Sequence, residues 1–182
     1  KGLFCDKNVN LYNKNTLTKG ATYYYVVMNY NQVEDVNLFH SQTTKSSNTK
    51  VISATQDGIL KAKYPGVAKV TVKPAAGSGL SMSKTLVVLP SKVTGVKLTA
   101  KKKAMKVAWK KTAGASGYKV YRATSKKGKY TCVKTASSKT TSFTNKKLKK
   151  NKKYYYKVCA FVKSGKKTYN GEYSTVVMKK AK

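Results

Sequence analysis

Acidic residues are scarce in this sequence. Five Asp and Glu stand against 39 Lys and Arg, which gives the 182 residues a formal net charge of +34. Glycoside hydrolysis needs two carboxyl groups at a fixed separation. The neighbours Glu34 and Asp35 would point to opposite faces of a strand. Asp57 belongs to a predicted turn and Glu172 stands alone in its half of the chain, so no catalytic carboxyl pair is predicted.

Histidine and cysteine are equally rare. His40 is the only histidine, and nothing near it in the sequence suggests a catalytic triad or a metal cluster. The three cysteines, Cys5, Cys132 and Cys159, are too scattered for a disulfide framework and show no Cys-x-x-Cys spacing of the kind that binds zinc. We therefore expect no enzyme activity, no catalytic or cofactor-binding residue, no metal site and no cofactor.

Long apolar runs and arginine are also missing. No stretch approaches the roughly 18 apolar residues that a membrane span needs, and no leader-like region is present, so any targeting signal would lie outside this segment. Arg122 is the only arginine, whereas bidentate arginines provide most direct readout of bases. Sequence-specific binding of nucleic acid is therefore not expected.

The residues that are abundant favour β-structure. Hydrophobic residues make up 40% of the chain, and Val, Tyr, Ile and Phe prevail with many Thr, which are strand-forming types. The composition changes at Pro90-Ser91. The first 90 residues carry a charge of +7, from eleven Lys and four acids, and the rest carry +27, from 28 Lys and Arg and one acid. We predict an all-β chain of two tandem immunoglobulin-like β-sandwiches, residues 1–90 and 91–182, joined by a short linker.

Residues 91–182 show the alternation of a seven-stranded sandwich. Trp109 is expected in the core, and Tyr154 follows Leu148 by six residues. This segment resembles a bacterial fibronectin type III module, in which Trp109 matches the core tryptophan and Tyr154 the tyrosine corner. Lys150 stands where that family often has proline. The predicted strands are Val93–Leu98, Met105–Trp109, Tyr118–Val120, Tyr130–Val133, Thr141–Thr144, Tyr154–Ala160 and Tyr173–Met178.

The first half contains a Ser46-Ser47-Asn48 run, an Asp57-Gly58 turn signal and a Pro65-Gly66-Val67-Ala68 motif, in that order. The series resembles the bacterial group 2 immunoglobulin-like module, although the family's tryptophan before the Ser-Ser-Asn run is missing. Both resemblances imply non-catalytic spacer or adhesion modules of an extracellular protein, secreted by or attached to the wall of Gram-positive bacteria. The predicted strands are Tyr23–Met28, Val51–Ala54, Ile59–Ala62, Val67–Val72 and Lys84–Leu89.

The lysine runs of the second half fall in predicted turns and at strand starts. A charge of this size attracts polyanions, so anionic cell-wall polymers and host polyanions are candidate partners. The alternative is that these lysines keep the module soluble and prevent strand edges from pairing. The candidate residues are Lys101, Lys102, Lys103, Lys126, Lys127, Lys146, Lys147, Lys149, Lys150, Lys152 and Lys153.

Alternation also predicts an exposed aromatic patch, Tyr121, Tyr155 and Phe161, on the outer face of one sheet. This patch would suit a carbohydrate or a neighbouring domain, whereas cross-strand pairing that stabilises the sheet is the alternative. Cys132 and Cys159 are expected on the same face, on strands that flank a third strand. A separation of about 9.6 Å, two strand spacings, is too wide for an easy disulfide.

An internal Lys–Asn isopeptide bond is a further alternative, since some surface modules of Gram-positive bacteria form one beside a buried acid. Glu34, Asp35 or Glu172 would be the candidate acids, and a solvated acid among lysines is the competing interpretation.

Overall fold

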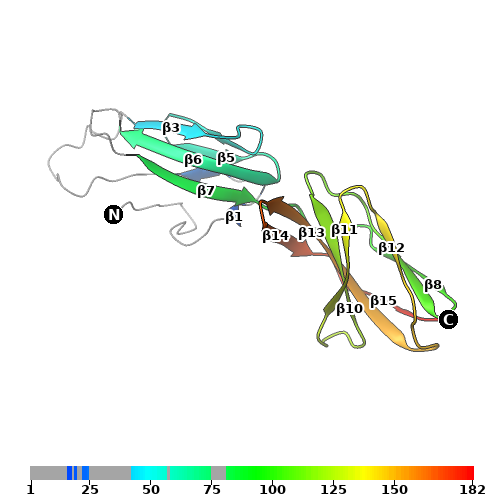
Figure 1. Ribbon diagram of the computed structural model, residues 1–182. Helices are drawn as coiled ribbons and strands as arrows, with labels where there is room; N and C mark the ends of the chain where they lie inside the picture. Colours follow the sequence, from blue (N-terminus) through cyan, green and yellow to red (C-terminus); the bar gives the residue numbers. More distant parts are fainter. Residues whose placement is uncertain (1–15, 18, 20–21, 25–41, 57, 75–80) are drawn as a thin grey trace. The chain divides into compact units, whose positions relative to one another are not determined.

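The computed structural model describes residues 16–17, 19, 22–24, 42–56, 58–74 and 81–182. Every regular element in these ranges is a β-strand, which confirms the all-β prediction. The chain separates into two compact units, Lys1–Leu89 (unit 1) and Pro90–Lys182 (unit 2), each drawn with its own sheets in Figure 1.

Unit 1 contains two sheets. The first has the strand order β1–β7–β6–β3, in which β1 runs parallel to β7 and the other pairs are antiparallel. The second has the order β2–β5–β4. The strands are β1 (Thr16–Leu17), β2 (Thr22–Tyr24), β3 (Gln42–Ser46), β4 (Ile52–Ala54), β5 (Ile59–Ala62), β6 (Gly66–Pro74) and β7 (Met82–Val88).

The core of unit 1 lies between these sheets. Ile52 and Leu60 come from the second sheet, Val70 and Leu86 from the first, and all four belong to one buried cluster. Alternation explains the arrangement, because every second side chain of a strand points to the same face. The β4–β5 hairpin was predicted from the Asp57-Gly58 signal and is confirmed, with Gly58 at φ 81° in the left-handed region.

In unit 1, strands β1 and β3 were not predicted, and one predicted strand lies partly outside the described residues. Strand β3 was not predicted, because Gln42–Ser46 is polar and has no apolar alternation; within its described side chains only Thr44 is buried. The predicted strand Tyr23–Met28 overlaps β2, but residues 25–28 lie outside the described part of the chain, as do Cys5, Glu34, Asp35, His40 and Asp57.

Unit 2 is described throughout and is a sandwich of two sheets. One sheet has the order β12–β9–β8, and the other has β11–β10–β13, with β14 and β15 both paired to β13. The strands are β8 (Lys97–Lys101), β9 (Ala104–Ala108), β10 (Gly117–Ala123), β11 (Thr131–Ser137), β12 (Ser142–Asn145), β13 (Lys153–Ser164), β14 (Lys167–Tyr173) and β15 (Val177–Lys180).

Aromatic side chains fill the core of unit 2. Trp109 is 5% exposed, and its ring centroid lies 5.5 Å from that of the fully buried Tyr118. Tyr156 is also fully buried, and its hydroxyl accepts a hydrogen bond from Asn145 Nδ2 at 3.0 Å. The core position predicted for Trp109 is confirmed, and burial of such large side chains contributes strongly to stability.

A tyrosine corner joins β12 to β13. The Tyr154 hydroxyl accepts a hydrogen bond from the Lys149 backbone N–H at 3.0 Å, and Leu148 is buried in the same core. This hydrogen bond confirms the tyrosine corner that the resemblance of residues 91–182 implied. The loop between β12 and β13 is therefore fixed to the sheet that follows it.

The first and last predicted strands of unit 2 begin or end elsewhere in the structure, beyond small shifts of bounds in the other strands. The first strand, predicted over Val93–Leu98, begins only at Lys97, although Val93 is still buried in the core. The last, predicted over Tyr173–Met178, was wrong in extent, because β14 and β15 are separated at Ser174. The Ser174 hydroxyl accepts the Val158 N–H at 3.0 Å, and the Ser174 N–H donates to Val158 O.

Candidate functional site

The predicted lysine residues lie in three connections of unit 2. The β8–β9 turn carries the first run, the β10–β11 loop the second, and the β12–β13 loop with the start of β13 the third. All of the candidate side chains are exposed. We call this set the lysine end: Lys101, Lys102, Lys103, Lys126, Lys127, Lys146, Lys147, Lys149, Lys150, Lys152 and Lys153.

Hydrogen bonds and strand pairing bring the three connections to one end of unit 2. The Leu148 N–H donates to Lys103 O at 2.9 Å, which joins the β12–β13 loop to the β8–β9 turn. Ala123, at the end of β10, pairs with Tyr155 near the start of β13, so the β10–β11 loop begins beside the third run. The end of the chain lies there too, as Figure 1 shows, because Lys103 N–H donates to Lys182 O at 2.7 Å.

Backbone strain coincides with the lysine end. Among the described residues, those other than glycine with positive φ are Lys103 (49°), Lys147 (58°) and Asn151 (61°). A left-handed backbone costs a residue with a Cβ roughly 1–2 kcal/mol and is usually given to glycine. Two of these positions hold lysine instead, and strained conformations of this kind concentrate at functional sites.

The lysine end carries charge of one sign. Glu172, the only acidic residue of unit 2, lies on β14 beside Tyr173, which pairs with Cys159 on β13. Cys159 is six residues from Lys153, or roughly 20 Å along the strand. Glu172 is also exposed, so it does not provide the buried acid that an isopeptide bond requires.

The structure adds lysines that the sequence analysis missed. Lys180 is exposed and pairs directly with Lys153 across β13 and β15, and Lys182 is exposed beside the β8–β9 turn. Like charges placed opposite each other on a sheet are destabilising. Lys180 and Lys182 are far from the other lysine runs in the sequence. Their proximity to Lys153 and Lys103 therefore becomes apparent only from the strand register and the hydrogen bonds.

One residue of the predicted aromatic patch is not available for binding. Phe161 lies on the expected face, but it is only 8% exposed and packs over Gly117, where an added Cβ would meet its ring at 2.6 Å. Its prediction as an exposed residue was therefore wrong, because Gly117 on the adjacent strand has no side chain and leaves space that the ring fills. Tyr121 and Tyr155 are partly exposed.

A different aromatic group forms on this face, and we call it the tyrosine cluster: Tyr121, Tyr130 and Tyr173 around Lys157. The Lys157 ammonium lies 3.8 Å from the ring centroid of Tyr173 and 4.5 Å from that of Tyr130. The Tyr121 and Tyr173 rings meet edge to face at 5.3 Å. Burial and then the neighbouring Tyr173 hydroxyl raise the pKa of Tyr121 above its usual value. Tyr121 and Tyr173 thus contact each other, and Tyr173 and Tyr130 both contact the Lys157 ammonium.

The two described cysteines are free thiols. Cys132 is exposed on β11 and Cys159 is buried on β13, with β10 between them as predicted. Burial raises the pKa of Cys159 to about 11.

Within the described residues, no group of three His, Cys, Asp or Glu side chains comes together in a way that could hold a metal ion. The same residues include no helix of the length and apolarity that would cross a membrane.

The solved structures to which the chain is similar include fibronectin type III domains. The FN1–FN3 domains of chicken CNTN1 are 16% identical over 93% of this chain and 63% of that one, with a TM-score of 0.46. An Fn3-like protein from Clostridium thermocellum is 26% identical over 48% of this chain and 88% of that one (TM-score 0.38). The fibronectin type-III domain of human fibronectin type III domain containing protein 3 is 20% identical over 58% and 92%, respectively (TM-score 0.43).

No family model matches the chain, and no curated protein matches it. The sandwich fold of unit 2 therefore rests on its own strand order, its buried Trp109 and its tyrosine corner.

Proposed function

We propose that the two units are non-catalytic modules of an extracellular bacterial surface protein, and that unit 2 binds an anionic polymer through the lysine end. Unit 2 would be a fibronectin type III module and unit 1 a group 2 bacterial immunoglobulin-like module. The observation that carries the binding proposal is the meeting of three lysine runs, far apart in sequence, at one end of the sandwich.

Electrostatics favours a polymer of repeated negative charge over a compact ligand. The lysines are exposed and distributed over three connections and the adjoining strand ends, and each ammonium is a strongly hydrated point charge on a flexible stem. Such a surface attracts phosphate or sulfate groups along a chain and gains free energy as counterions are released. Candidate polymers are phosphate-bearing wall polymers and sulfated glycans.

The test compares two charge-matched variants of the full chain. Lys146→Gln/Lys149→Gln/Lys150→Gln removes three charges from the lysine end. Lys163→Gln/Lys166→Gln/Lys167→Gln removes three exposed charges at the β13–β14 turn, which lies at the other end of β13. Affinity for poly(glycerol phosphate) and for heparin is measured for both at the same ionic strength.

The first variant should lose at least about tenfold in affinity, since a lysine near a charged surface contributes about 1 kcal/mol. The second should stay close to the unsubstituted chain. Equal losses in both variants would show that overall charge, rather than the lysine end, attracts the polymer. Absence of binding by the unsubstituted chain at physiological salt would leave the spacer role as the function of both units.

Carbohydrate binding by the tyrosine cluster is a second candidate, favoured by the 41% exposure of Tyr173. Such binding would be insensitive to salt and would be abolished by Tyr173→Ala. The contacts of Tyr173 with Tyr121 and Lys157 give the cluster a structural role as well, so the folded state of that variant must be checked by its thermal unfolding.

A further inference from the structure

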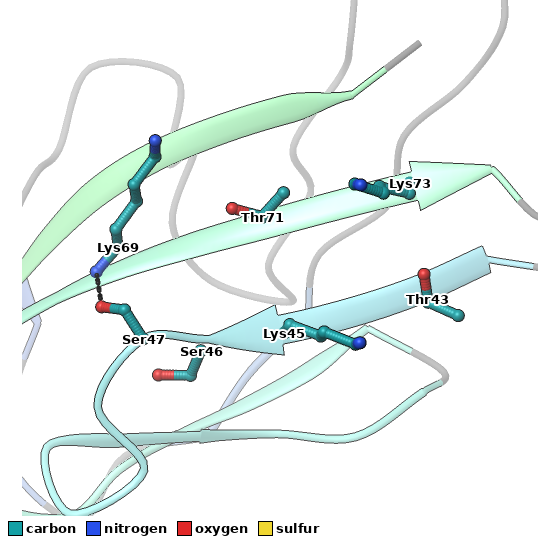
Figure 2. Close-up of a pocket in the computed structure, with 7 residues that line it drawn as sticks. All are labelled: Thr43, Lys45, Ser46, Ser47, Lys69, Thr71 and Lys73. Carbon is teal, nitrogen blue, oxygen red and sulfur yellow. Dashed lines mark hydrogen bonds between the residues drawn. The ribbon is translucent and has the colours of Figure 1, made fainter. Parts of the chain in front are cut away.

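A hollow of about 320 Å³ lies on the outer face of the first sheet of unit 1. Figure 2 shows it over β3 and β6, with Thr71 between Lys69 and Lys73 along β6 and with Lys45 on the neighbouring strand. Its lining consists only of lysines and hydroxyl residues: Thr43, Lys45, Ser46, Ser47, Lys69, Thr71 and Lys73.

Strand register explains why three lysines surround one threonine. Lys45 pairs directly with Thr71 across β3 and β6, and Lys73 pairs with Thr43. Lys69 and Lys73 stand two residues before and after Thr71, so all three lysines share its face. Diagonal neighbours on a sheet lie about 7–8 Å apart, and no acidic residue is among the described residues of the lining.

Protection of the sheet edge does not account for this arrangement. Lysine on an edge strand prevents pairing with another chain, and this explains Lys45 on β3, which ends the described sheet. Lys69 and Lys73 lie on β6, however, which is hydrogen-bonded to β3 on one side and to β7 on the other. Edge protection therefore does not explain Lys69 and Lys73. Each of them lies diagonally beside Lys45, and a bound anion would offset the charge that these neighbours share.

The hydroxyl groups are positioned as donors. Ser47 Oγ accepts the Lys69 backbone N–H at 2.8 Å, the bond drawn in Figure 2, so the proton of its hydroxyl remains available. Thr71 Oγ1 and Ser83 Oγ lie 2.8 Å apart, so the Thr71 hydroxyl can donate to a ligand when Ser83 donates to Thr71. The lining thus offers ammonium and hydroxyl donors, which match the oxygens of a tetrahedral anion.

We propose that this hollow on β3 and β6 binds the phosphate or sulfate group of an ester. The volume exceeds that of the bare anion and leaves room for the group that carries it. The site belongs to unit 1 and is separate from the lysine end of unit 2, so it does not depend on the function proposed above.

Titration of the full ¹⁵N-labelled chain with inorganic phosphate, and separately with sulfate, tests the site by NMR at an ionic strength held constant with NaCl. The amides of Lys45, Ser47 and Thr71 should shift along saturable curves. Lys45→Gln and Lys73→Gln should each weaken binding at least about fivefold, as expected for the loss of a charge-assisted contact. Lys61→Gln, an exposed position on β5 of the other sheet, is the control and should have no effect.

Shifts that rise linearly without saturation, or an equal weakening by Lys61→Gln, would overturn the proposal. The same titration with glycerol phosphate and with glucosamine 6-sulfate then shows whether the hollow prefers a phosphate ester or a sulfate ester. Failure of both compounds to bind would also overturn the proposal. The three-lysine variant of the lysine end should keep the phosphate response, whereas Lys45→Gln should keep the affinity for polymer. The two sites can therefore fail independently.

Discussion

At the scale of single residues, the lysine end combines charge with an unfavourable backbone. Lys103 and Lys147 adopt left-handed conformations that glycine would adopt without strain. Their lysine side chains add positive charge at positions where stability alone would favour another residue. A residue that lowers stability but adds charge is expected at positions that bind a ligand, because function is then maintained at the expense of stability.

Replacement of Lys147 by glycine separates these two effects. Lys147→Gly should leave stability unchanged or raise it by up to about 1 kcal/mol, because relief of strain offsets the added freedom of the unfolded chain. The neighbouring Lys146 has no left-handed backbone, so Lys146→Gly should lower stability by about 0.5–1 kcal/mol. Urea unfolding measures both variants, and a greater loss for Lys147→Gly would contradict the account.

The tyrosine corner makes a second residue-scale prediction. Tyr154→Phe removes the acceptor of the Lys149 N–H and keeps the ring, so the free energy of unfolding should fall by about 1 kcal/mol. Tyr155→Phe, on the partly exposed face, is the matched control and should change it little. Denaturant titration of both variants suffices, and equal effects would mean that the Tyr154 hydrogen bond does not fix the loop.

The cysteines should differ in reactivity. Iodoacetamide at pH 8 should modify exposed Cys132 much faster than buried Cys159, whose pKa is raised to about 11 by burial. The raised pKa means that the folded state disfavours the thiolate. Stability should therefore be complete below the usual thiol pKa and should fall as the pH rises from there through about 11. Peptide mapping measures the modification of each cysteine by iodoacetamide. Equal modification of Cys132 and Cys159 in the folded state would contradict the burial of Cys159.

At the scale of elements, close approach of three strands depends on Gly117. A Cβ at this position would collide with Ala136 O on β11 and with the Phe161 ring on β13. Gly117→Ala should therefore cost about 1–3 kcal/mol by overpacking. Gly165→Ala, in the β13–β14 turn at φ 55° and with no atom within 4 Å, tests backbone strain alone. A smaller cost for Gly117→Ala than for Gly165→Ala in thermal unfolding would contradict the packing argument.

The elements that sequence could predict are those in which an apolar pattern decides the structure. Met105–Trp109 alternates, so β9 was predictable from its pattern, whereas the tyrosine corner was implied by the resemblance that Leu148 and Tyr154 carry. Polar β3 was not, because it is held by pairing with β6 rather than by apolar side chains. The break between β14 and β15 at Ser174 was also not predictable from the sequence. There the Ser174 hydroxyl accepts the Val158 N–H, which would otherwise bond to a backbone carbonyl of the neighbouring strand.

The candidate site was predictable in its residues but not in its geometry. The lysine runs are visible in the sequence, yet their meeting at one end follows from the pairing of β10 with β13 and from the Leu148–Lys103 hydrogen bond. Lys157 of the tyrosine cluster was missed for the same reason, because Tyr130 reaches it from the β10–β11 loop and Tyr173 from the end of β14.

At the scale of the whole molecule, charge is distributed unequally between the two halves of the chain. The first 90 residues carry +7 and the remaining 92 carry +27. A net charge of this size keeps a protein soluble and attracts polyanions at long range, and added salt weakens both effects. Binding centred on the lysine end must therefore depend strongly on ionic strength.

The dependence of polymer affinity on salt tests this account most directly. The dissociation constant of the full chain for poly(glycerol phosphate) is measured over a series of NaCl concentrations. Log affinity should fall linearly and steeply with log salt, and the three-lysine variant of the lysine end should reduce the slope by about two, because each charge contact contributes about 0.7–0.9. The charge-matched variant at the β13–β14 turn should keep the full slope. A flat dependence, or no binding at low salt, would contradict the account.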